Sequence, residues 1–294
     1  MKVSVVMPSH NYAQYLSRAI ECVLSQSYSN LELIITDDCS SDGSRAIVED
    51  WKRSDDRVKT VFHTENRGVS AARNSGLAVS SGELIAFCDA DDNWMTDKLK
   101  IQMECLRRRP ESGLVHSDCL IIDSTGNLTG QRFSLLHQRS GQATSGSLFS
   151  ELCQRNFLCI STVILRRECV QYAKRFEEGF RSLEDWVYWT RVSRKYPFYY
   201  VDDPLAEYRV HAASLSQDTN GISLARVKAY SLLLQEFEDI PSQIKSRMTY
   251  ALGMSYAEIG DSRRAARAFV NSLRYDAFQV RAWPRLAQAF CKRS

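Results

Sequence analysis

The stretch Leu84-Ile-Ala-Phe-Cys-Asp-Ala-Asp-Asp92 places three carboxylates directly after a run of apolar residues. The apolar part, 84–88, has the length and composition of a buried strand. The three carboxylates at its end cannot all be buried without a counter-charge. A divalent cation, Mg²⁺ or Mn²⁺, would supply that charge through carboxylate oxygens. The alternative is a solvated acidic turn.

The same order of apolar run, polar turn and helix recurs upstream. Apolar runs at 3–7, 31–35 and 58–62 predict three more strands. Helical spacing follows each run, at 12–23, 44–53 and 69–80, and Asn11 is a candidate N-cap of the first helix. This alternation indicates βαβ units and a mostly parallel sheet, and therefore an α/β fold. Ligands bind beyond the carboxyl ends of such strands, so the polar strand ends should face one crevice.

Downstream of residue 96 the pattern is mixed. We expect helices at 97–109 and 183–195, strands at 114–122, 162–165 and 198–201, and a mobile loop at 126–147. From about residue 222 the chain is helical throughout. The sequence therefore predicts an α/β domain over 1–220 and a helical extension over 221–294.

Residues 250–274 of the extension resemble one tetratricopeptide unit. Small and aromatic residues fall where they would pack a helix pair: Gly253, Tyr256, Gly260, Ala265 and Phe269. One such repeat cannot bury its own face, and about three are usual. A simple helical hairpin is therefore an equal alternative.

Composition excludes several classes of protein. The 294 residues carry 38 Lys and Arg against 35 Asp and Glu, a net charge of +3, which is too weak to indicate a nucleic acid or an acidic membrane as partner. No apolar run is long enough to span a membrane, and the start of the chain reads as a strand rather than a signal peptide. The nine cysteines are odd in number and form no C-x-x-C, so we expect buried free thiols in a reducing cytosol.

Further candidate residues lie at other strand ends. Asp37 and Asp38 end the second predicted strand, where they could bind a base or a ribose, or could cap the next helix. Arg67 and Arg73 are candidate diphosphate contacts, although Arg73 could instead be a plain helix-surface residue.

Two candidates come late in the chain. Glu184-Asp185 begins an aromatic-rich helix, where a carboxylate either favours the helix dipole or, partly desolvated, acts as a general base. His211 is either a metal ligand or diphosphate contact, or an ordinary core or surface histidine.

The order of these motifs is more informative than any one of them. The chain carries, in sequence, Val3-Ser-Val-Val-Met-Pro-Ser-His-Asn11, Asp37-Asp-Cys-Ser-Ser-Asp-Gly43, Asn66-Arg-Gly-Val-Ser-Ala-Ala-Arg-Asn74, Asp89-Ala-Asp-Asp92, Glu184-Asp185 and Tyr208-Arg-Val-His211. Over residues 1 to about 217 this order closely resembles the family 2 glycosyltransferases. The resemblance implies a GT-A fold, with a mostly parallel nucleotide-binding sheet flanked by helices, here followed by an all-helical C-terminal extension.

The resemblance also implies a role for each matching position. The nucleotide side of the site would consist of Pro8, His10, Asn11, Asp38, Arg73, Asp89 and Asp91. A divalent cation, Mn²⁺ or Mg²⁺, would be held by Asp91, Asp89 and His211, with Asp91 the more direct ligand. Asp185 corresponds to the catalytic base of inverting members. The chain departs from the family pattern at His10, where many members carry Tyr, and at Cys39, where Gly is common.

The implied activity is transfer of a hexose from a nucleotide-sugar donor to a hydroxyl of a carbohydrate or glycolipid acceptor, with inversion, in surface polysaccharide or glycoconjugate synthesis. The lack of an apolar run long enough to span a membrane leads us to expect a cytoplasmic location, either free or peripheral at the inner face of the membrane. Two alternatives stay open. One is a non-catalytic scaffold that binds a sugar nucleotide. The other is a nucleotidyltransferase, which would favour a Gly-rich basic loop near the N-terminus that this chain lacks.

Overall fold

The computed structural model describes residues 1–137, 144–212, 218–279 and 281–291. The chain forms two compact units. The first contains Met1–Leu148, Phe157–Gly179 and Arg191–His211, and the second contains Phe149–Asn156, Phe180–Thr190 and Ala212–Ser294. The domain boundary expected near residue 220 stays a prediction.

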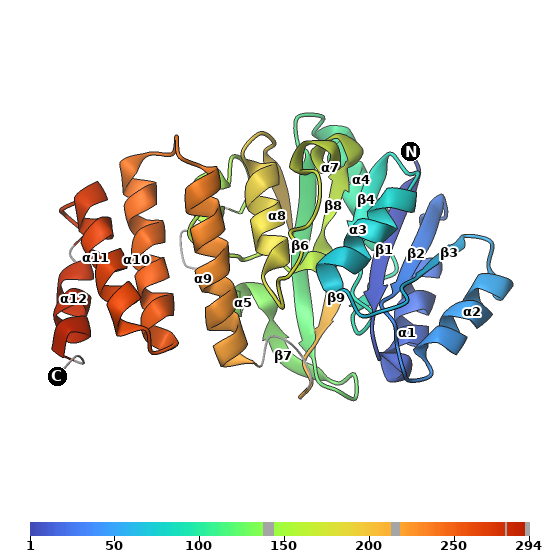
Figure 1. The fold of residues 1–294 in the computed structure, drawn as a ribbon. Coiled ribbons are helices and arrows are strands. Elements are labelled where there is room, and N and C mark those ends of the chain that lie inside the picture. The colour runs from blue at the N-terminus through green and yellow to red at the C-terminus, as the bar shows by residue number, and fades with distance from the viewer. Residues whose placement is uncertain (138–143, 213–217, 280, 292–294) are drawn as a thin grey trace. The chain divides into compact units, whose positions relative to one another are not determined.

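The first unit is built on one mixed sheet. Over the described residues it has nine strands in the order β3-β2-β1-β4-β8-β6-β9-β5, with β7 paired to β6 (Figure 1). Four consecutive strands of this order are parallel: β1 (Val3–Ser9), β2 (Leu31–Asp37), β3 (Val58–Phe62) and β4 (Leu84–Phe87). These four strands confirm the α/β prediction.

The remaining strands make the sheet mixed. β6 (Leu114–Ile122) runs parallel to β9 (Phe198–Arg209). The antiparallel members are β5 (Asn93–Trp94) on β9, β7 (Leu128–Arg132) on β6, and β8 (Ile164–Arg166) between β4 and β6.

Helices cover this sheet and bury its central strands. Every residue of β1 and β2 is buried, as expected for parallel strands covered on both faces. The helices are α1 (Ala13–Leu24), α2 (Ser44–Ser54), α3 (Val69–Val79), α4 (Lys98–Arg108), α5 (Phe133–His137) and α7 (Arg167–Ala173), with a 3₁₀ turn at Ile160–Thr162. Helix α3 packs closely on the sheet at Gly76, where an added Cβ would lie 2.7 Å from Val6 Cγ1.

Two predicted segments differ from the structure. The expected strand at 198–201 continues to Arg209 as β9, with irregular pairing to β6 at Ser117–Cys119. The expected loop at 126–147 contains β7 and α5, while its residues 138–143 lie outside the described part of the chain. β7 was missed because all its residues are exposed, so it has no apolar run.

Asn11 is not the N-cap of the first helix. Its φ of 59° is left-handed, and its Oδ1 accepts a hydrogen bond from the Ser41 amide at 2.8 Å. Helix α1 begins at Ala13, whose amide donates to Asp42 Oδ2 at 3.0 Å. The loops after β1 and β2 therefore hold each other in place.

The cysteines mostly follow the prediction. The eight cysteines whose side chains the structure describes are free thiols, and six are buried: Cys22, Cys88, Cys119, Cys153, Cys159 and Cys169. Cys105 is half-buried, and Cys39 is exposed, contrary to expectation. Cys39 lies in the turn after β2, where its φ of 61° is also left-handed.

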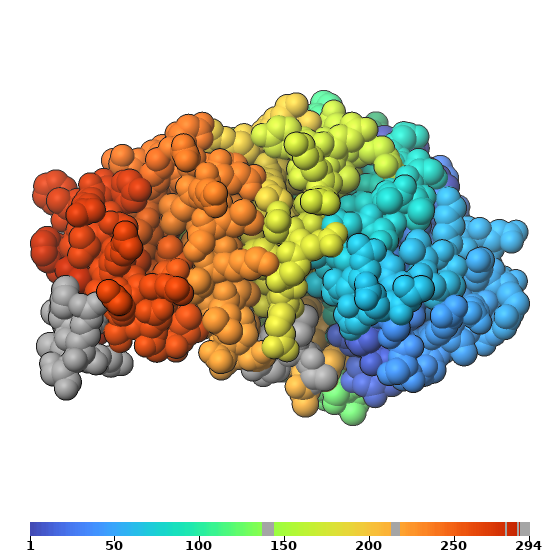
Figure 2. Space-filling model, viewed as in Figure 1, coloured from blue at the N-terminus to red at the C-terminus, as the bar shows by residue number. Residues whose placement is uncertain are grey.

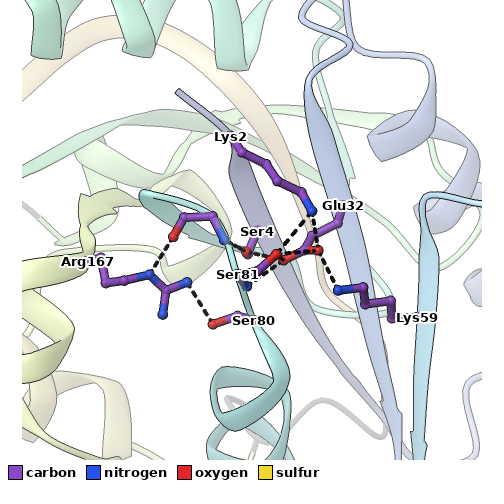
Figure 3. Close-up of polar contacts among 8 residues, drawn as sticks. Lys2, Ser4, Glu32, Lys59, Ser80, Ser81 and Arg167 are labelled. Atoms are coloured by element: carbon purple, nitrogen blue, oxygen red, sulfur yellow. Dashed lines mark hydrogen bonds and ion pairs between the residues drawn. The ribbon is translucent and has the colours of Figure 1, made fainter.

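Glu32 of β2 is a buried carboxylate surrounded by donors (Figure 3). It is only 2% exposed, and it accepts hydrogen bonds from Ser4 Oγ at 2.6 Å and the Ser81 amide at 2.7 Å. Lys2 Nζ and Lys59 Nζ lie 2.6 and 2.8 Å from its Oε2. Burial alone would raise the pKa of Glu32, but these hydrogen bonds hold that pKa well below its usual value.

We expect Glu32→Gln to lower the free energy of unfolding at pH 7 by about 2 kcal/mol, because Lys2 and Lys59 lose a buried counter-charge. A depressed carboxyl pKa stabilises the fold above the unfolded pKa of about 4.3, and that stability is lost as the pH falls below it. Urea unfolding should therefore show a difference between wild type and variant that shrinks at acid pH. Glu21→Gln, which breaks the exposed pair with Arg18, should change stability by less than about 0.5 kcal/mol. A Glu32→Gln change that small would contradict this account.

Lys98, at the start of α4, is a fully buried amine. Its Nζ donates to Gln102 Oε1 at 2.7 Å and lies 4.0 Å from the centroid of the Trp94 ring. Burial lowers the pKa of Lys98 to about 7. The unfolded chain, whose lysine pKa is about 10.4, therefore binds more protons than the folded chain above neutral pH.

The buried amine predicts that stability rises with pH above about 7, by up to about 1.4 kcal/mol per pH unit. Lys98→Met should remove this slope, which is measured as the difference in unfolding free energy between wild type and variant at several pH values. The exposed lysine of the same helix provides the control, since Lys100→Met should keep the wild-type slope. Parallel pH profiles for wild type and Lys98→Met would rule the assignment out.

The second unit is helical in its described part. It contains α6 (Phe149–Leu152), the first turns of α8 (Glu184–Ser193), and α9 (Thr219–Glu236), α10 (Ser242–Glu258), α11 (Ser262–Tyr275) and α12 (Ala282–Cys291). α8 packs on α9 through Trp186 and Tyr230, whose ring centroids are 4.8 Å apart. α10 packs on α11 at Gly253, where an added Cβ would lie 2.6 Å from the Phe269 ring. Among the described residues, no helix is long and apolar enough to cross a bilayer.

Candidate active site

The polar ends of the parallel strands meet at one edge of the sheet, as predicted. Ser9 at the end of β1 pairs with Asp37 at the end of β2, and Asp37 pairs in turn with Phe62 at the end of β3. Just beyond β4, the Cys88 amide donates to the carbonyl of Val6 at 3.2 Å. Asp89 therefore leaves the sheet at the same edge as Ser9 and Asp37.

Asp89 is oriented by a buried arginine. Arg73 comes from α3, is almost fully buried, and donates from Nη2 to Asp89 Oδ1 at 2.7 Å. The Asp89 amide donates to Ser161 Oγ at 3.1 Å. Arg73 is thus not the plain surface residue that the sequence left open. Arg67 is exposed, and its guanidinium lies 3.9 Å from Glu178.

Asp91 is held by His211. The distance from Asp91 Oδ2 to His211 Nε2 is 3.0 Å, and both side chains are largely buried. The His211 ring lies against Tyr15 of α1, with ring centroids 5.3 Å apart. The structure therefore brings together the two residues that the sequence separates by 120 positions.

Asp92 is a fully buried carboxylate that ties the acidic loop to other strands. Ser161 Oγ donates to its Oδ2 at 2.6 Å, and the Arg209 amide donates to its Oδ1 at 3.0 Å. Arg209 also donates from Nε to the carbonyl of Asp91 at 2.8 Å and stacks 4.7 Å from the Tyr15 ring. Since both Asp92 oxygens are used internally, Asp92 positions the loop.

The acidic loop has an excess of negative charge. Burial and the charge of Asp89 raise the pKa of Asp91, although the hydrogen bond to His211 lowers it. Burial and the charges of Asp91 and Asp89 raise the pKa of Asp92 well above its usual value. Burial and the same three carboxylates raise the pKa of the nearby Tyr12 hydroxyl. A cation bound at this edge would offset the repulsion among these negative charges.

The residues present fit a divalent cation held jointly with a ligand. Asp91 and Asp89 offer the hard carboxylate oxygens that Mg²⁺ and Mn²⁺ take. Within the described ranges, no three His, Cys, Asp or Glu side chains are grouped to hold a metal ion by themselves. Mg²⁺ is usually bound by one or two carboxylates together with substrate phosphates, which agrees with this partial donor set.

Asp38 anchors the loop that follows β3. It is buried, and it accepts hydrogen bonds from His63 Nδ1 at 2.6 Å, the Arg67 amide at 2.9 Å and the Gly68 amide at 2.7 Å. His63 Nε2 is in turn 2.9 Å from Ser75 Oγ of α3. Asp38 is therefore at the predicted strand end, where it also fixes the turn into α3.

The segment after β1 lies beside Asp38. Pro8 is buried within β1, and His10 Nδ1 lies 2.8 Å from the carbonyl oxygen of Asp38. Asn11, turned by its left-handed backbone, holds the loop after β2. Pro8, His10, Asn11 and Asp38 are thus brought together as the sequence predicted.

Asp185 belongs to the second unit, in the first turn of α8. Its Oδ1 accepts from the Trp186 amide at 2.7 Å, and its Oδ2 accepts from Asn156 Nδ2 at 3.0 Å. Leu183, the residue just before α8, has a left-handed φ of 66°, a conformation that costs a β-carbon-bearing residue about 1–2 kcal/mol. Such strain is typical of functional turns.

Sequence reasoning missed three residues of the site: Ser161, Arg209 and His63. Their partners Asp92 and Asp38 lie 69, 117 and 25 positions away along the chain, so no local pattern reveals the pairing. Of the three, only Arg209 could have been found from the sequence, because it lies in the motif Tyr208-Arg-Val-His211.

Comparison with known proteins identifies the family. The family model described as Glycosyl transferase family 2 matches residues 4–170. The chain is 31% identical over 217 residues to TuaG of Bacillus subtilis, a glycosyltransferase named for teichuronic acid biosynthesis. The alignment covers 74% of this chain and 82% of TuaG. The chain is 26% identical over 283 residues to a Campylobacter jejuni β-1,3-glucosyltransferase named for the acceptor GalNAc(5)-diNAcBac-PP-undecaprenol, covering 90% of this chain and 85% of that one.

The fold matches a solved glycosyltransferase. The crystal structure of residues 1–349 of S. aureus TarS in complex with UDP-GlcNAc aligns with a TM-score of 0.69 at 16% identity, covering 99% of this chain and 89% of that 1–349 chain. The fold is therefore GT-A with additional C-terminal helices. Together with the family model, which covers more than half of the chain, these findings show that the protein belongs to glycosyltransferase family 2.

Proposed function

We propose that the protein is a metal-dependent, inverting glycosyltransferase that takes a hexose from a nucleoside diphosphate donor. The observation that carries this proposal is the pair of oriented carboxylates beyond β4, with Asp89 fixed by Arg73 and Asp91 by His211. A divalent cation at Asp91 and Asp89 would neutralise the charge that develops on the departing diphosphate.

The residues after β1 and β2 would bind the nucleoside. Pro8, His10, Asn11 and Asp38 form one end of the sheet edge that also carries Asp89. His10 is held by the Asp38 carbonyl and replaces the tyrosine common in the family, so it would contact the base edge-on or face-on with a smaller ring. Arg73, which donates to Asp89 Oδ1 at 2.7 Å, would hold that carboxylate turned toward the ribose and diphosphate.

Asp185 would act on the acceptor. It would take the proton from the acceptor hydroxyl as that oxygen attacks the anomeric carbon from the face opposite the leaving diphosphate, which inverts the configuration. Asn156 and the Trp186 amide hold the two carboxylate oxygens in place, and hence act as positioning groups.

We further propose that the acceptor is a glycolipid and that the protein works at the cytoplasmic face of a membrane. The name of the Campylobacter jejuni relative gives an undecaprenol-linked acceptor, which supports a lipid-linked acceptor here. The eight cysteines whose side chains the structure describes are free thiols, which agrees with a reducing compartment.

The proposal is tested by incubating the protein with a panel of nucleotide sugars and Mn²⁺. Thermal unfolding identifies the donor, because a ligand that binds only the folded state raises the apparent stability. Release of the nucleoside diphosphate then measures turnover, with and without a chelator. We expect one donor to raise the unfolding temperature and to be consumed only when the cation is present.

Three other outcomes would replace the proposal. Turnover that survives the chelator would remove the cation from the mechanism. Tight donor binding with neither transfer nor hydrolysis would indicate a sugar-nucleotide-binding scaffold. Release of pyrophosphate from a nucleoside triphosphate would indicate a nucleotidyltransferase.

A further inference from the structure

Positive charge is concentrated at the C-terminal end of the chain. Residues 242–294 contain ten Lys or Arg and three Asp or Glu, whereas the preceding 241 residues contain 28 Lys or Arg and 32 Asp or Glu. The near-neutral total of +3 is therefore the sum of a net charge of +7 over residues 242–294 and a net charge of −4 over residues 1–241. A local basic segment favours an anionic partner even where the whole chain does not.

The basic helices enclose a groove of about 620 Å³, lined by residues of α9, α10 and α11 and of the α9–α10 link. Lys245, Arg264 and Arg267 supply three cations to its lining, and Glu238 supplies the single carboxylate. In the described part of the chain Arg267 makes no ion pair, and the Arg264 side chain, which pairs with Asp261 at 3.5 Å, is 69% exposed. The groove therefore has a strong excess of positive charge.

A buried hydroxyl in the same groove lacks a hydrogen-bond partner. Thr249 is only 5% exposed, and its Oγ1 finds no donor or acceptor among the described residues. Buried polar groups are almost always hydrogen-bonded, so an unpaired hydroxyl in the lining of a groove is a candidate contact for a bound group. A phosphate oxygen would satisfy this hydroxyl and the nearby cations together.

Large aromatic side chains are exposed next to this groove along the chain. Tyr275 lines the groove, and it is followed by Phe278 and Trp283, which are 88% and 57% exposed. Arginines flank them at 274, 281 and 285. Exposed aromatic rings interspersed with basic residues are typical of segments that lie at a membrane interface.

We propose that α10, α11 and α12 form a docking surface for an anionic phospholipid membrane. The groove takes a lipid phosphate at Lys245, Arg264 and Arg267, and Phe278 and Trp283 enter the headgroup layer. Figure 2 shows α10, α11 and α12 (orange to red) at the surface of the molecule. The charge favours an acidic surface, and the exposed aromatic rings favour a bilayer over an acidic protein.

The test uses the full-length protein and sedimentation with vesicles. Vesicles of phosphatidylcholine are compared with vesicles that also contain about 30% phosphatidylglycerol, a typical anionic fraction. We expect the protein to bind the anionic vesicles only, and less tightly as the salt concentration rises. Equal binding to both vesicles, or binding to neither, would overturn the proposal.

Two sets of variants separate the groove from general charge. Arg264→Gln with Arg267→Gln should weaken vesicle binding by about tenfold to thirtyfold, since each basic residue near an anionic surface contributes a few-fold to affinity. Arg18→Gln with Arg45→Gln removes the same charge from exposed positions of the first unit and should have little effect. Phe278→Ser with Trp283→Ser should abolish binding at low salt. An equal loss in the Arg18 and Arg45 control would show that net charge alone drives the binding.

Two other partners, a soluble anion and an acidic protein, are tested by separate binding experiments. If inorganic phosphate raises the unfolding temperature through Arg267 while vesicles are not bound, the groove is a site for a soluble anion. If a poly-glutamate peptide binds in place of vesicles, the partner is an acidic protein. The docking variants should keep wild-type turnover of the donor with a soluble acceptor, so failure of docking and failure of the proposed reaction are measured separately.

Discussion

Asp91→Asn should lower kcat/KM for donor turnover by about 10²- to 10³-fold while leaving the protein folded. The amide keeps the size of the carboxylate and can still pair with His211 Nε2, which lies 3.0 Å away. It loses the negative charge that a divalent cation and its diphosphate would need, and charge stabilisation of this kind contributes several kcal/mol to a transition state. The measurement is nucleoside diphosphate release at saturating Mn²⁺.

A fold defect is excluded by thermal unfolding of the same variant. Asp91 is largely buried beside Asp89 and Asp92, so replacing it by a neutral amide should leave the unfolding temperature unchanged or raise it. Asp50→Asn, which removes an exposed carboxylate of α2, is the matched control and should retain full activity. If Asp91→Asn kept more than about a tenth of the wild-type turnover, Asp91 would not be the cation ligand, since loss of one charge-stabilising group costs more than that.

Much of the fold was predictable because the central strands are completely buried, and buried strands have a recognisable apolar pattern in the sequence. All residues of β1 and β2 are buried, so each strand contains a mostly apolar run, at 3–7 and 31–35, in which Ser4 and Glu32 are the polar members. β9 was cut short in the prediction because Asp202 and Asp203 are exposed and are followed by Pro204, a combination typical of a turn. Its pairing with β6 over nine positions overrides those local preferences.

The candidate site was predictable only in part. Asp89 and Asp91 stand out because two carboxylates follow an apolar strand directly, and Arg73 and His211 were found through the order of motifs. The contacts that fix these residues could not be predicted, because they join distant segments: Ser161 reaches back to Asp92, and Arg209 packs against Tyr15. The sequence likewise could not reveal that Asp38 is satisfied by three donors from the loop before α3.

Asp185→Asn should lower kcat by about 10²- to 10⁴-fold, the range expected for loss of a general base. The KM for the donor should be unchanged, because the proposed role of Asp185 is toward the acceptor hydroxyl alone. Asparagine at 185 keeps a carbonyl oxygen that can accept the hydrogen bond from the Trp186 amide. The side-chain amide of Asn156 can flip by about 180°, so that its oxygen accepts from the new NH₂ group. The measurement is a full kinetic analysis with donor and acceptor varied in turn.

The neighbouring carboxylate decides between catalysis and helix stabilisation. Glu184 and Asp185 both lie in the first turn of α8, where the helix dipole favours each of them by about 0.3–1 kcal/mol. If the dipole were their whole role, Glu184→Gln and Asp185→Asn would have similar small effects on stability and on kcat. A base at 185 predicts instead that Asp185→Asn loses turnover while Glu184→Gln retains most of it, with comparable unfolding temperatures. Loss of turnover in Glu184→Gln alone would move the base to residue 184, because successive residues of a helix project about 100° apart.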